Sequence, residues 1–287
     1  MLIEPGAGMA PIDALLRSAR HSVDLVMYEL EDTQADQLLA GAAARGVDVR
    51  VLLNSAYTGS VNDTAFAYLR RHGVHVRWAS PLYALTHEKT LVLDGSIAVV
   101  MTLNLTSRYY SDTRDVAVVD RIPSDVSAIE ATFDADDDGS RIVPGRGADL
   151  VWSPTTSLPD LLTLIGAAKH ELLVENEEMS NSDITDALTA AARRGVNVEI
   201  CMTNSSSWSS AFAGLAGAGV HIRVYAPDAA LYIHAKVIVR DPGSGDQEAF
   251  AGSQNFSTES LRYNRELGIV FENGTEVGQL AAMIQRD

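Results

Sequence analysis

Two distant stretches of this 287-residue chain repeat one spacing of histidine, lysine and aspartate. THEKTLVLDG lies at 86–95 and YIHAKVIVRD at 232–241, so His-x-Lys-x-x-x-x-Asp occurs twice. The sequence has only three lysines, and two of them, Lys89 and Lys236, lie in these stretches. This repeated pattern constrains the fold more than any other feature, because both copies need equivalent surroundings.

The repeat extends well beyond the two motifs. GVDVRVLLN at 46–54 reappears as GVNVEICMTN at 195–204, and FAYLRRHGVHVRWASP at 66–81 reappears as FAGLAGAGVHIRVYAP at 212–227. The offset between copies stays between 146 and 151 residues throughout. A steady offset over many segments predicts two similar halves in one chain, related by a pseudo-twofold axis.

Each half is predicted to be α/β. Apolar runs of strand length alternate with amphipathic segments, which is typical of a sheet covered by helices. In the first half we expect helices at 11–20, 33–46 and 62–73, and strands at 23–30, 47–54, 74–79, 89–95 and 97–104. The acidic, Gly-containing stretch 134–150 is predicted to be a linker or long surface loop. We therefore expect two lobes, 1–140 and 141–287, each with a helix-covered mixed sheet.

The charge of the chain limits its partners. The formal net charge is −16 and the sequence pI is about 4.7. Such a surface repels nucleic-acid phosphates at long range, so we expect no broad nucleic-acid-binding face, although a small phosphate pocket remains compatible with it. The single cysteine, Cys201, lies in an apolar run and is predicted to be a buried strand thiol.

The start of the chain carries no targeting signal. MLIEPGAGMAP has neither a basic first segment nor a long apolar one, and no apolar run approaches membrane-span length. We therefore expect a soluble protein without a signal peptide in this chain. A secreted or periplasmic location would require a leader that had been removed.

The His-x-Lys spacing suits phosphoryl chemistry. Residues i and i+2 of a strand face the same side, so His87 lies beside Lys89, and His234 beside Lys236. An ammonium binds phosphate oxygens and disfavours protonation of its neighbour, and a neutral imidazole is a competent nucleophile or base.

Duplication would supply two imidazoles facing one phosphate. One histidine would attack phosphorus while the other protonates the leaving oxygen and later activates water. Asn104 and Asn255 are each followed eleven residues later by an acid, Asp115 or Glu266. We expect these acids to orient the imidazoles, as the third member of a catalytic triad does.

At these residues the chain resembles the phospholipase D superfamily, and within that family it resembles the bacterial phospholipase D-like proteins. The family signature is HxKx4Dx6GSxN, given twice in two-domain members. Its second copy here comprises His234, Lys236, Asp241, Gly252, Ser253 and Asn255, with the insertion PGSGDQEAF lengthening a hairpin. The first copy comprises His87, Lys89, Asp94 and Asn104, but has Met101 and Thr102 where the family has Gly-Ser.

The resemblance implies an α-β-α-β-α sandwich with the active site between the lobes. It implies metal-independent phosphodiester cleavage through a phospho-histidine, without a cofactor, with His87 as nucleophile and His234 as general acid/base. A reversed assignment remains open because the first motif departs from the signature. Thr102, Asn104, Ser253 and Asn255 are then candidate phosphate ligands, and Asp94, Asp241 and Gly252 structural residues.

Three functions fit these residues. The first is a phospholipase D-type hydrolase that acts on a glycerophospholipid, with transfer to alcohols as a second outcome. The second is a metal-independent nuclease, and the third is a non-enzymatic phosphate-binding protein. We favour the first function, and we expect transient contact with a membrane or micelle. We also expect a monomer to be sufficient for activity, because both motifs lie in one chain.

Several polar and aromatic residues are candidates for the rim of the site. Tyr57 and Trp208 lie in matching loops, and Tyr109 and Tyr110 follow Asn104. Such aromatics could contact a lipid or a base, or pack within their loops. Glu29, Glu175 and Glu177 follow matching strands and could bind a cationic head group. We favour their being solvated charges.

Overall fold

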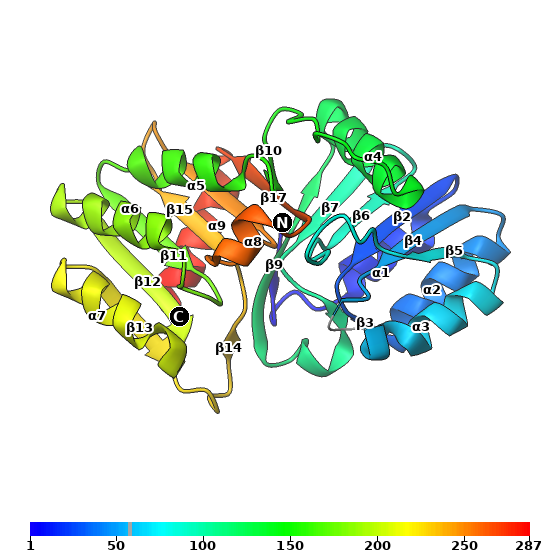
Figure 1. Ribbon diagram of the computed structural model, residues 1–287, viewed down its shortest axis with the longest axis horizontal. Coiled ribbons are helices and arrows are strands. Elements are labelled where there is room, and N and C mark those ends of the chain that lie inside the picture. The colour runs from blue at the N-terminus through cyan, green and yellow to red at the C-terminus, as the bar shows by residue number, and fades with distance from the viewer. Residues whose placement is uncertain (57–58) are drawn as a thin grey trace.

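The computed structural model describes residues 1–56 and 59–287. It has two lobes, one for each half of the sequence (Figure 1). The elements of the first half are β1 (Leu2–Glu4), α1 (Ala10–Ser18), β2 (Ser22–Met27), β3 (Leu30–Glu31), α2 (Thr33–Ala44), β4 (Asp48–Leu53), α3 (Gly59–Arg71), β5 (His75–Trp78), β6 (Thr90–Leu93), β7 (Ile97–Met101), β8 (Leu105–Thr106), the 3-10 helix η1 (Ser107–Tyr109), β9 (Thr113–Asp120) and α4 (Pro123–Asp138).

The second half follows a similar order. Its elements are β10 (Leu150–Ser153), α5 (Ser157–Gly166), β11 (Glu171–Glu175), α6 (Ser182–Arg193), β12 (Asn197–Thr203), the 3-10 helix η2 (Ser206–Trp208), α7 (Ser209–Gly217), β13 (His221–Tyr225), β14 (Tyr232–Ile233), β15 (Val237–Arg240), β16 (Glu248–Gly252), α8 (Thr258–Arg262), β17 (Glu266–Phe271) and α9 (Gly274–Arg286).

The two sheets have the same strand order. The first runs β1-β9-β7-β6-β2-β4-β5 and the second β10-β17-β16-β15-β11-β12-β13, which match strand for strand. In each, the last three strands are mutually parallel and the others pair antiparallel. The predicted fold class, two lobes that each hold a helix-covered mixed sheet, is confirmed.

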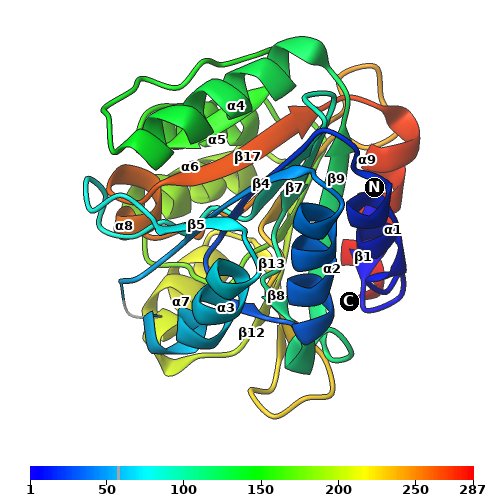
Figure 2. The same ribbon diagram turned by 90° about the vertical axis from the view of Figure 1, so that its right-hand side faces the viewer.

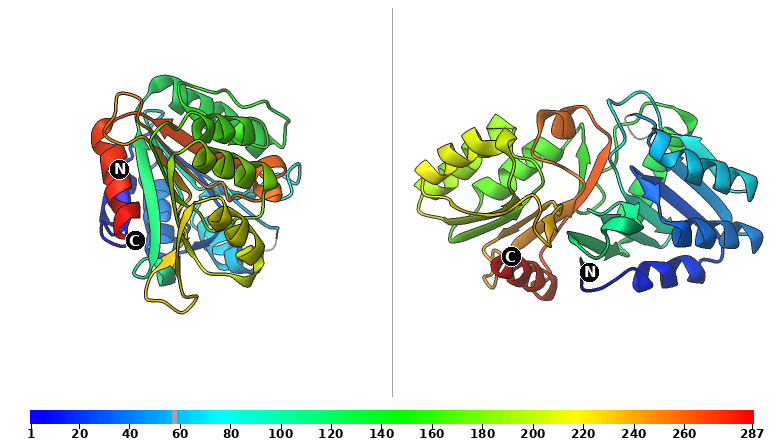
Figure 3. Two further views of the ribbon diagram at one scale, coloured as in Figure 1. Left: turned by 90° about the vertical axis from the view of Figure 1, so that its left-hand side faces the viewer. Right: turned by 90° about the horizontal axis from the view of Figure 1, so that it is seen from below.

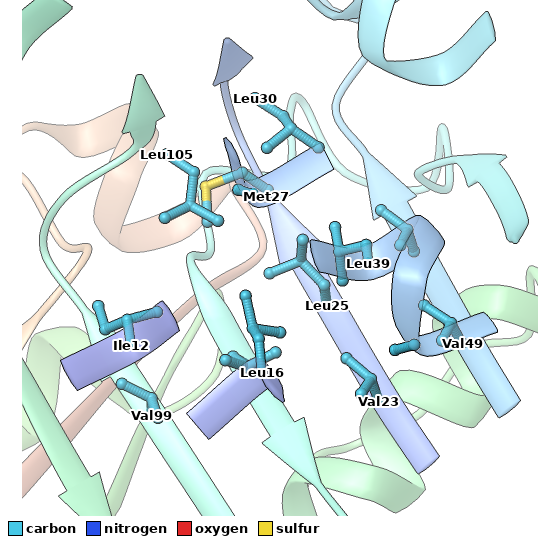
Figure 4. Packing of buried hydrophobic residues seen from close by; sticks show 14 of the residues in the cluster. Ile12, Leu16, Val23, Leu25, Met27, Leu30, Leu39, Val49, Val99 and Leu105 are labelled. Atoms are coloured by element: carbon cyan, nitrogen blue, oxygen red, sulfur yellow. The ribbon is translucent and has the colours of Figure 1, made fainter. Parts of the chain in front are cut away.

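Five layers follow from how the strands bury their two faces. Helices α1, α2 and α3 cover the outer face of the first sheet, and α5, α6 and α7 that of the second (Figures 1 and 2). Alternate residues of β2, namely Val23, Leu25 and Met27, enter the first outer core because side chains alternate along a strand (Figure 4). A central core joins the inner faces of both sheets with α4 and α9.

Helix ends follow the sequence signals. Gly46 and Gly73, predicted to stop α2 and α3, have φ angles of 88° and 83°, a left-handed conformation that glycine adopts without strain. The insertion after Asp241 lengthens the β15–β16 hairpin, as predicted. None of the helices in the described residues is long and apolar enough to cross a membrane.

The predicted linker at 134–150 is partly wrong, because α4 continues to Asp138 and the loop begins at Gly139. Acids at a helix C-terminus are unfavourable unless a cation compensates them. Here Asp136 pairs with Arg265 at 2.8 Å, and Arg77 lies 3.5 Å from Asp137.

The predicted domain boundary, 140/141, lies within the remaining loop between α4 and β10 and stays a prediction. The two lobes are joined by strand pairing and by the central core, and both chain termini lie near their junction (Figure 3).

Candidate active site

Short segments of each half pair with the other half and bring the two motifs together. β14 pairs in parallel with the start of β9, with Ile233 opposite Arg114. In the same way Thr86 forms a parallel bridge with Arg265. Each pairing sets the residue before a motif histidine opposite the residue before the acid of the other half.

Each imidazole is therefore held by a carboxylate of the opposite half. His87 Nδ1 lies 3.0 Å from Glu266 Oε2, and His234 Nδ1 lies 2.8 Å from Asp115 Oδ1. An ionised carboxylate only accepts hydrogen bonds, so it keeps a proton on Nδ1 and leaves Nε2 for chemistry. The sequence spacing predicted acids beside the imidazoles but carried no signal that the pairs cross between halves.

The two acids are themselves held, by different side chains. Thr102 Oγ1 donates to Asp115 Oδ1 at 2.5 Å. Ser260 Oγ and Asn264 Nδ2 donate to Glu266 Oε1 at 2.6 and 2.9 Å. Sequence reasoning missed Ser260 and Asn264. It also placed Thr102 among the phosphate ligands, whereas its fully buried hydroxyl is bonded to the acid.

An arginine beside each acid is clamped from the opposite half. Arg114 Nη2 donates to Asp287 Oδ1 at 2.8 Å, and Arg265 Nε lies 2.8 Å from Asp136 Oδ2. Asp136 lies in α4, and Asp287 directly follows α9, the corresponding helix of the second half. The clamps therefore hold the strand ends that carry the orienting acids.

Both motif lysines are buried, and different groups cover them. Each Nζ donates to the carbonyl of its own motif histidine at 2.5 Å. Lys89 Nζ lies 4.9 Å from the centroid of the Tyr28 ring, whereas Lys236 Nζ donates to Glu177 Oε2 at 3.1 Å. One lysine thus faces an aromatic ring and the other a carboxylate.

Burial and charge set the protonation of the first histidine. Burial, followed by the positive charge of Lys89, lowers the pKa of His87 to about 4. Burial, followed by the charge of Lys236, lowers the pKa of Lys89 to about 7. Burial opposes ionisation of Glu266, but its interactions with His87 and Ser260 lower its pKa overall. At neutral pH His87 is therefore a neutral imidazole.

A cavity of about 550 Å³ lies over both imidazoles. Its acidic lining consists of Glu4, Glu29, Asp112, Asp115, Glu177 and Glu178. Its aromatic lining consists of Tyr28, Tyr109, Tyr110 and Tyr232. No arginine or lysine is among the described residues that line it. A cavity of this charge is poorly suited to a polyanion.

The predicted asparagines line this cavity, but the neighbouring hydroxyl residue of the second motif does not. Asn255 Nδ2 donates to Glu178 Oε1 at 3.2 Å, and Oδ1 of Asn104 and of Asn255 has no partner within the described residues. Ser253 is fully buried, and its carbonyl oxygen lies 3.1 Å from His87 Nδ1. Residues 1–56 and 59–287 contain no group of three or more His, Cys, Asp or Glu side chains that could hold a metal ion.

The motif aspartates lie at turns away from the cavity. Asp94 accepts backbone N–H bonds from residues 20–22, and Asp241 from residues 169–171. Both residues have positive φ angles, 52° and 46°. Burial opposes ionisation of both carboxyls, but these backbone N–H bonds together lower the pKa of each. They hold each turn to the strand that follows the first helix of its half.

The Gly-to-Met difference between the motifs lies in the cores. A Cβ atom on Gly252 would lie 2.5 Å from Gly268 Cα, so that position admits no side chain. Met101 is fully buried in the first outer core opposite Ala117. Met101 is not among the described residues that line the cavity, so it does not shape it.

The asymmetry lies instead between Tyr28 and Glu177. Tyr28 packs edge-on against His87, with ring centroids 4.6 Å apart, while Glu177 Oε2 lies 3.4 Å from His234 Nε2. The prediction that Glu177 is a solvated charge is wrong, and so is that for Glu175, which is fully buried. Their position after matching strands was the available signal.

Of the other residues predicted at the rim of the site, some line the cavity and others do not. Tyr109 and Tyr110 line the cavity, and Tyr110 also donates to Asp32 Oδ2 at 2.9 Å. Trp208 packs against the second outer core and does not line the cavity. Tyr57 lies outside the described residues.

Comparison with known proteins assigns both halves to one family. Residues 12–136 and 161–287 match the family model described as cardiolipin synthase, PLD-like domain. Cardiolipin synthase A of Klebsiella pneumoniae (strain 342) is 26% identical over 329 aligned residues, covering 95% of this chain and 66% of that protein. Cardiolipin synthase A of Yersinia pseudotuberculosis serotype O:3 (strain YPIII) is 25% identical, covering 94% and 66%. The chain thus spans about two thirds of these relatives' length.

Two solved structures share the fold across nearly the whole chain. Phosphatidylserine synthase from Haemophilus influenzae Rd KW20 has a TM-score of 0.72 at 10% identity, covering 99% of this chain and 84% of that one. Polyphosphate kinase from Porphyromonas gingivalis has a TM-score of 0.73 at 16% identity, covering 99% and 49%. At these identities the likeness concerns the fold alone.

Proposed function

This chain belongs to the phospholipase D superfamily, a family of phosphodiester-processing enzymes, and from that premise we propose that it cleaves the head-group phosphodiester of a glycerophospholipid. The supporting observation is the pair of crossed histidine–carboxylate contacts that face one cavity. The proposed intermediate is a phospho-histidine, and the second step ends in hydrolysis or in transfer to an alcohol.

In the first step, Nε2 of His87 attacks phosphorus and the bond from phosphorus to the head-group oxygen breaks. His234 gives its Nε2 proton to that oxygen. The low pKa of His87 supports its role as nucleophile, because the ring is neutral at pH 7. The contact of His234 Nε2 with Glu177, a proton acceptor, supports its role as the acid.

In the second step, His234 removes a proton from water or an alcohol, whose oxygen attacks phosphorus. The bond between phosphorus and His87 Nε2 breaks, and His87 returns to its neutral state. Lys89, Lys236 and the asparagines of the cavity are proposed to bind the non-bridging oxygens, whose charge must be stabilised during the transfer.

Two findings bear on the substrate. The relatives are named cardiolipin synthases, which supports a phospholipid substrate and adds phosphatidyl transfer as an outcome. The carboxylates of the cavity disfavour nucleic acid, whose phosphates they would repel. We therefore do not favour the nuclease alternative.

Head-group release tests the proposal. Mixed micelles of phosphatidylcholine, phosphatidylethanolamine and phosphatidylglycerol would be incubated with the protein and EDTA, with and without an added alcohol. Single-stranded and duplex DNA would be assayed beside them over a range of salt. We expect release or exchange of a lipid head group that is lost in His87→Ala. DNA cleavage without lipid turnover would contradict the proposed substrate.

A further inference from the structure

Tyr28 and Glu177 occupy the same place in the two halves. Leu25 of β2 pairs with Leu91 of β6, and Val174 of β11 pairs with Ile238 of β15. Tyr28 and Glu177 each lie three residues beyond those matched positions, where the chain leaves the central strand. Both then contact the histidine and lysine of their own half.

The two contacts differ in charge. The Tyr28 ring offers Lys89 a weak cation–π contact and no anionic oxygen. Oε2 of Glu177 lies 3.1 Å from Lys236 Nζ and 3.4 Å from His234 Nε2. Burial opposes ionisation of Glu177, but Lys236 and then His234 lower its pKa overall, so the carboxylate is charged at neutral pH.

A phosphate oxygen has the same needs as this carboxylate oxygen. It is anionic, it accepts from an ammonium, and it must lie beside Nε2 of the histidine that exchanges a proton with its substituents. Lys236 is fully buried, and its Nζ donates to Glu177 and to the His234 carbonyl. Glu177 lines the cavity and Lys236 does not, so a phosphate that binds Lys236 from the cavity has to displace Glu177.

We propose that Glu177 is a specificity-determining residue, an internal competitor that occupies the phosphate-oxygen position between Lys236 and His234. The part of this inference that concerns turnover of a substrate rests on the proposed function. A free phosphate ion brings no contacts that compensate for displacing Glu177, and is disfavoured. A larger phosphodiester compensates through its other groups, so the site favours substrate over small free anions.

Tyr232 helps to hold the competitor in place. Its hydroxyl donates to Glu177 Oε1 at 3.0 Å, and its backbone N–H donates to Asp112 of the other half at 2.7 Å. The Glu177 side chain is 25% exposed at the cavity, so it has room to move when a phosphate enters.

Binding of inorganic phosphate tests the inference without any turnover. Titration calorimetry would compare the wild type with Glu177→Gln, which keeps the shape and removes the charge. We expect phosphate to bind Glu177→Gln about tenfold or more tightly, because removing one like charge at contact distance is worth at least about 1.4 kcal/mol. Glu177→Asp, whose carboxylate withdraws from Lys236, is expected to bind phosphate with intermediate affinity.

Glu29→Gln is the matched control, because Glu29 lines the same cavity without a described contact to either motif lysine. We expect its phosphate affinity to stay within about twofold of the wild type, since an uncontacted charge is partly screened. If thermal unfolding shows that Glu177→Gln and the wild type are both folded, and both bind phosphate with equal affinity, the inference is overturned. Tighter phosphate binding without lipid turnover in either protein would support the inference and remove the proposed function.

Discussion

The two halves of the molecule share one topology and differ at the surface where they meet. Seven strands of each sheet match in order, and each half lends its acid to the histidine of the other. The His87 side faces a tyrosine ring, whereas the His234 side faces a carboxylate. The backbone of the two halves is therefore nearly symmetric, whereas the side chains around the two histidines differ.

The largest expected effect comes from removing either imidazole. His87→Ala and His234→Ala should each lower head-group release by at least about 1,000-fold, because each removes a nucleophile or a proton-transfer group. Steady-state release from micelles would measure this. His221→Ala, at an exposed position of β13, is the control. Near-normal turnover in His234→Ala would show that one half suffices.

Next in size is the loss of an orienting charge. Glu266→Gln and Asp115→Asn should each lower the rate by about 100-fold or more, because the amide no longer fixes the Nδ1 proton of the opposite imidazole. Both variants keep a side chain of similar shape, so circular dichroism should be unchanged. Normal rates in both variants would show that turnover does not need the contacts between each imidazole and the acid of the opposite half.

The clamps between the halves are expected to affect stability. Asp136→Asn leaves the fully buried Arg265 without its ion pair, and should lower the free energy of unfolding by about 3 kcal/mol. Chemical denaturation would measure the loss. Asp134→Asn, which breaks an ion pair whose carboxylate is 59% exposed, should cost less than about 1 kcal/mol. A loss in Asp136→Asn as small as that expected for Asp134→Asn would mean that the clamp adds little to stability.

A smaller loss of stability should follow from filling the glycine of the second motif. Gly252→Ala places a Cβ 2.5 Å from Gly268 Cα and should cost about 1–3 kcal/mol. In the first half, Met101 stands at the position of Gly252, and Ala117 at the position of Gly268. Gly214→Ala in α7 meets nothing within 4 Å, and should leave the midpoint of denaturation unchanged or raised.

The last expected effect is a protonation equilibrium. The pKa of His87 falls from its ordinary 6.5 to about 4 on folding. The unfolded chain therefore binds more protons between those values, so this group's stabilisation is complete above pH 6.5 and is lost as the pH falls towards 4. Titration of its ring resonance by NMR, assigned with His87→Ala, should give a midpoint near 4. A midpoint near 6.5 would contradict the burial of this ring.

The repeated motif predicted much of the fold and most of the side chains that meet beside the cavity. It identified the two lobes, both histidine–lysine pairs and the two acids, because strand periodicity and spacing fix which side chains share a face. It did not identify the crossing of the pairs, since no local pattern encodes β14 pairing with β9.

The supporting residues could not be read from spacing either. Ser260 of α8 and Asn264 of the turn between α8 and β17 hold Glu266, whereas Thr102 holds Asp115 from within the motif itself. The end of α4 was predicted as loop because its acids are typical of a linker. The contacts of Asp136 with Arg265 and of Asp137 with Arg77, which stabilise that helix end, form only in the folded chain.

Trapping the covalent intermediate tests the central claim most directly. A phospholipid with a radiolabelled phosphate would be mixed with wild-type protein and with His234→Ala, quenched in alkali, digested and mapped by mass spectrometry. We predict label on the peptide that contains His87, and its accumulation in His234→Ala, where no group activates the second step. Label on the His234 peptide of the wild type, or turnover without any labelled histidine, would contradict the division of labour between the halves.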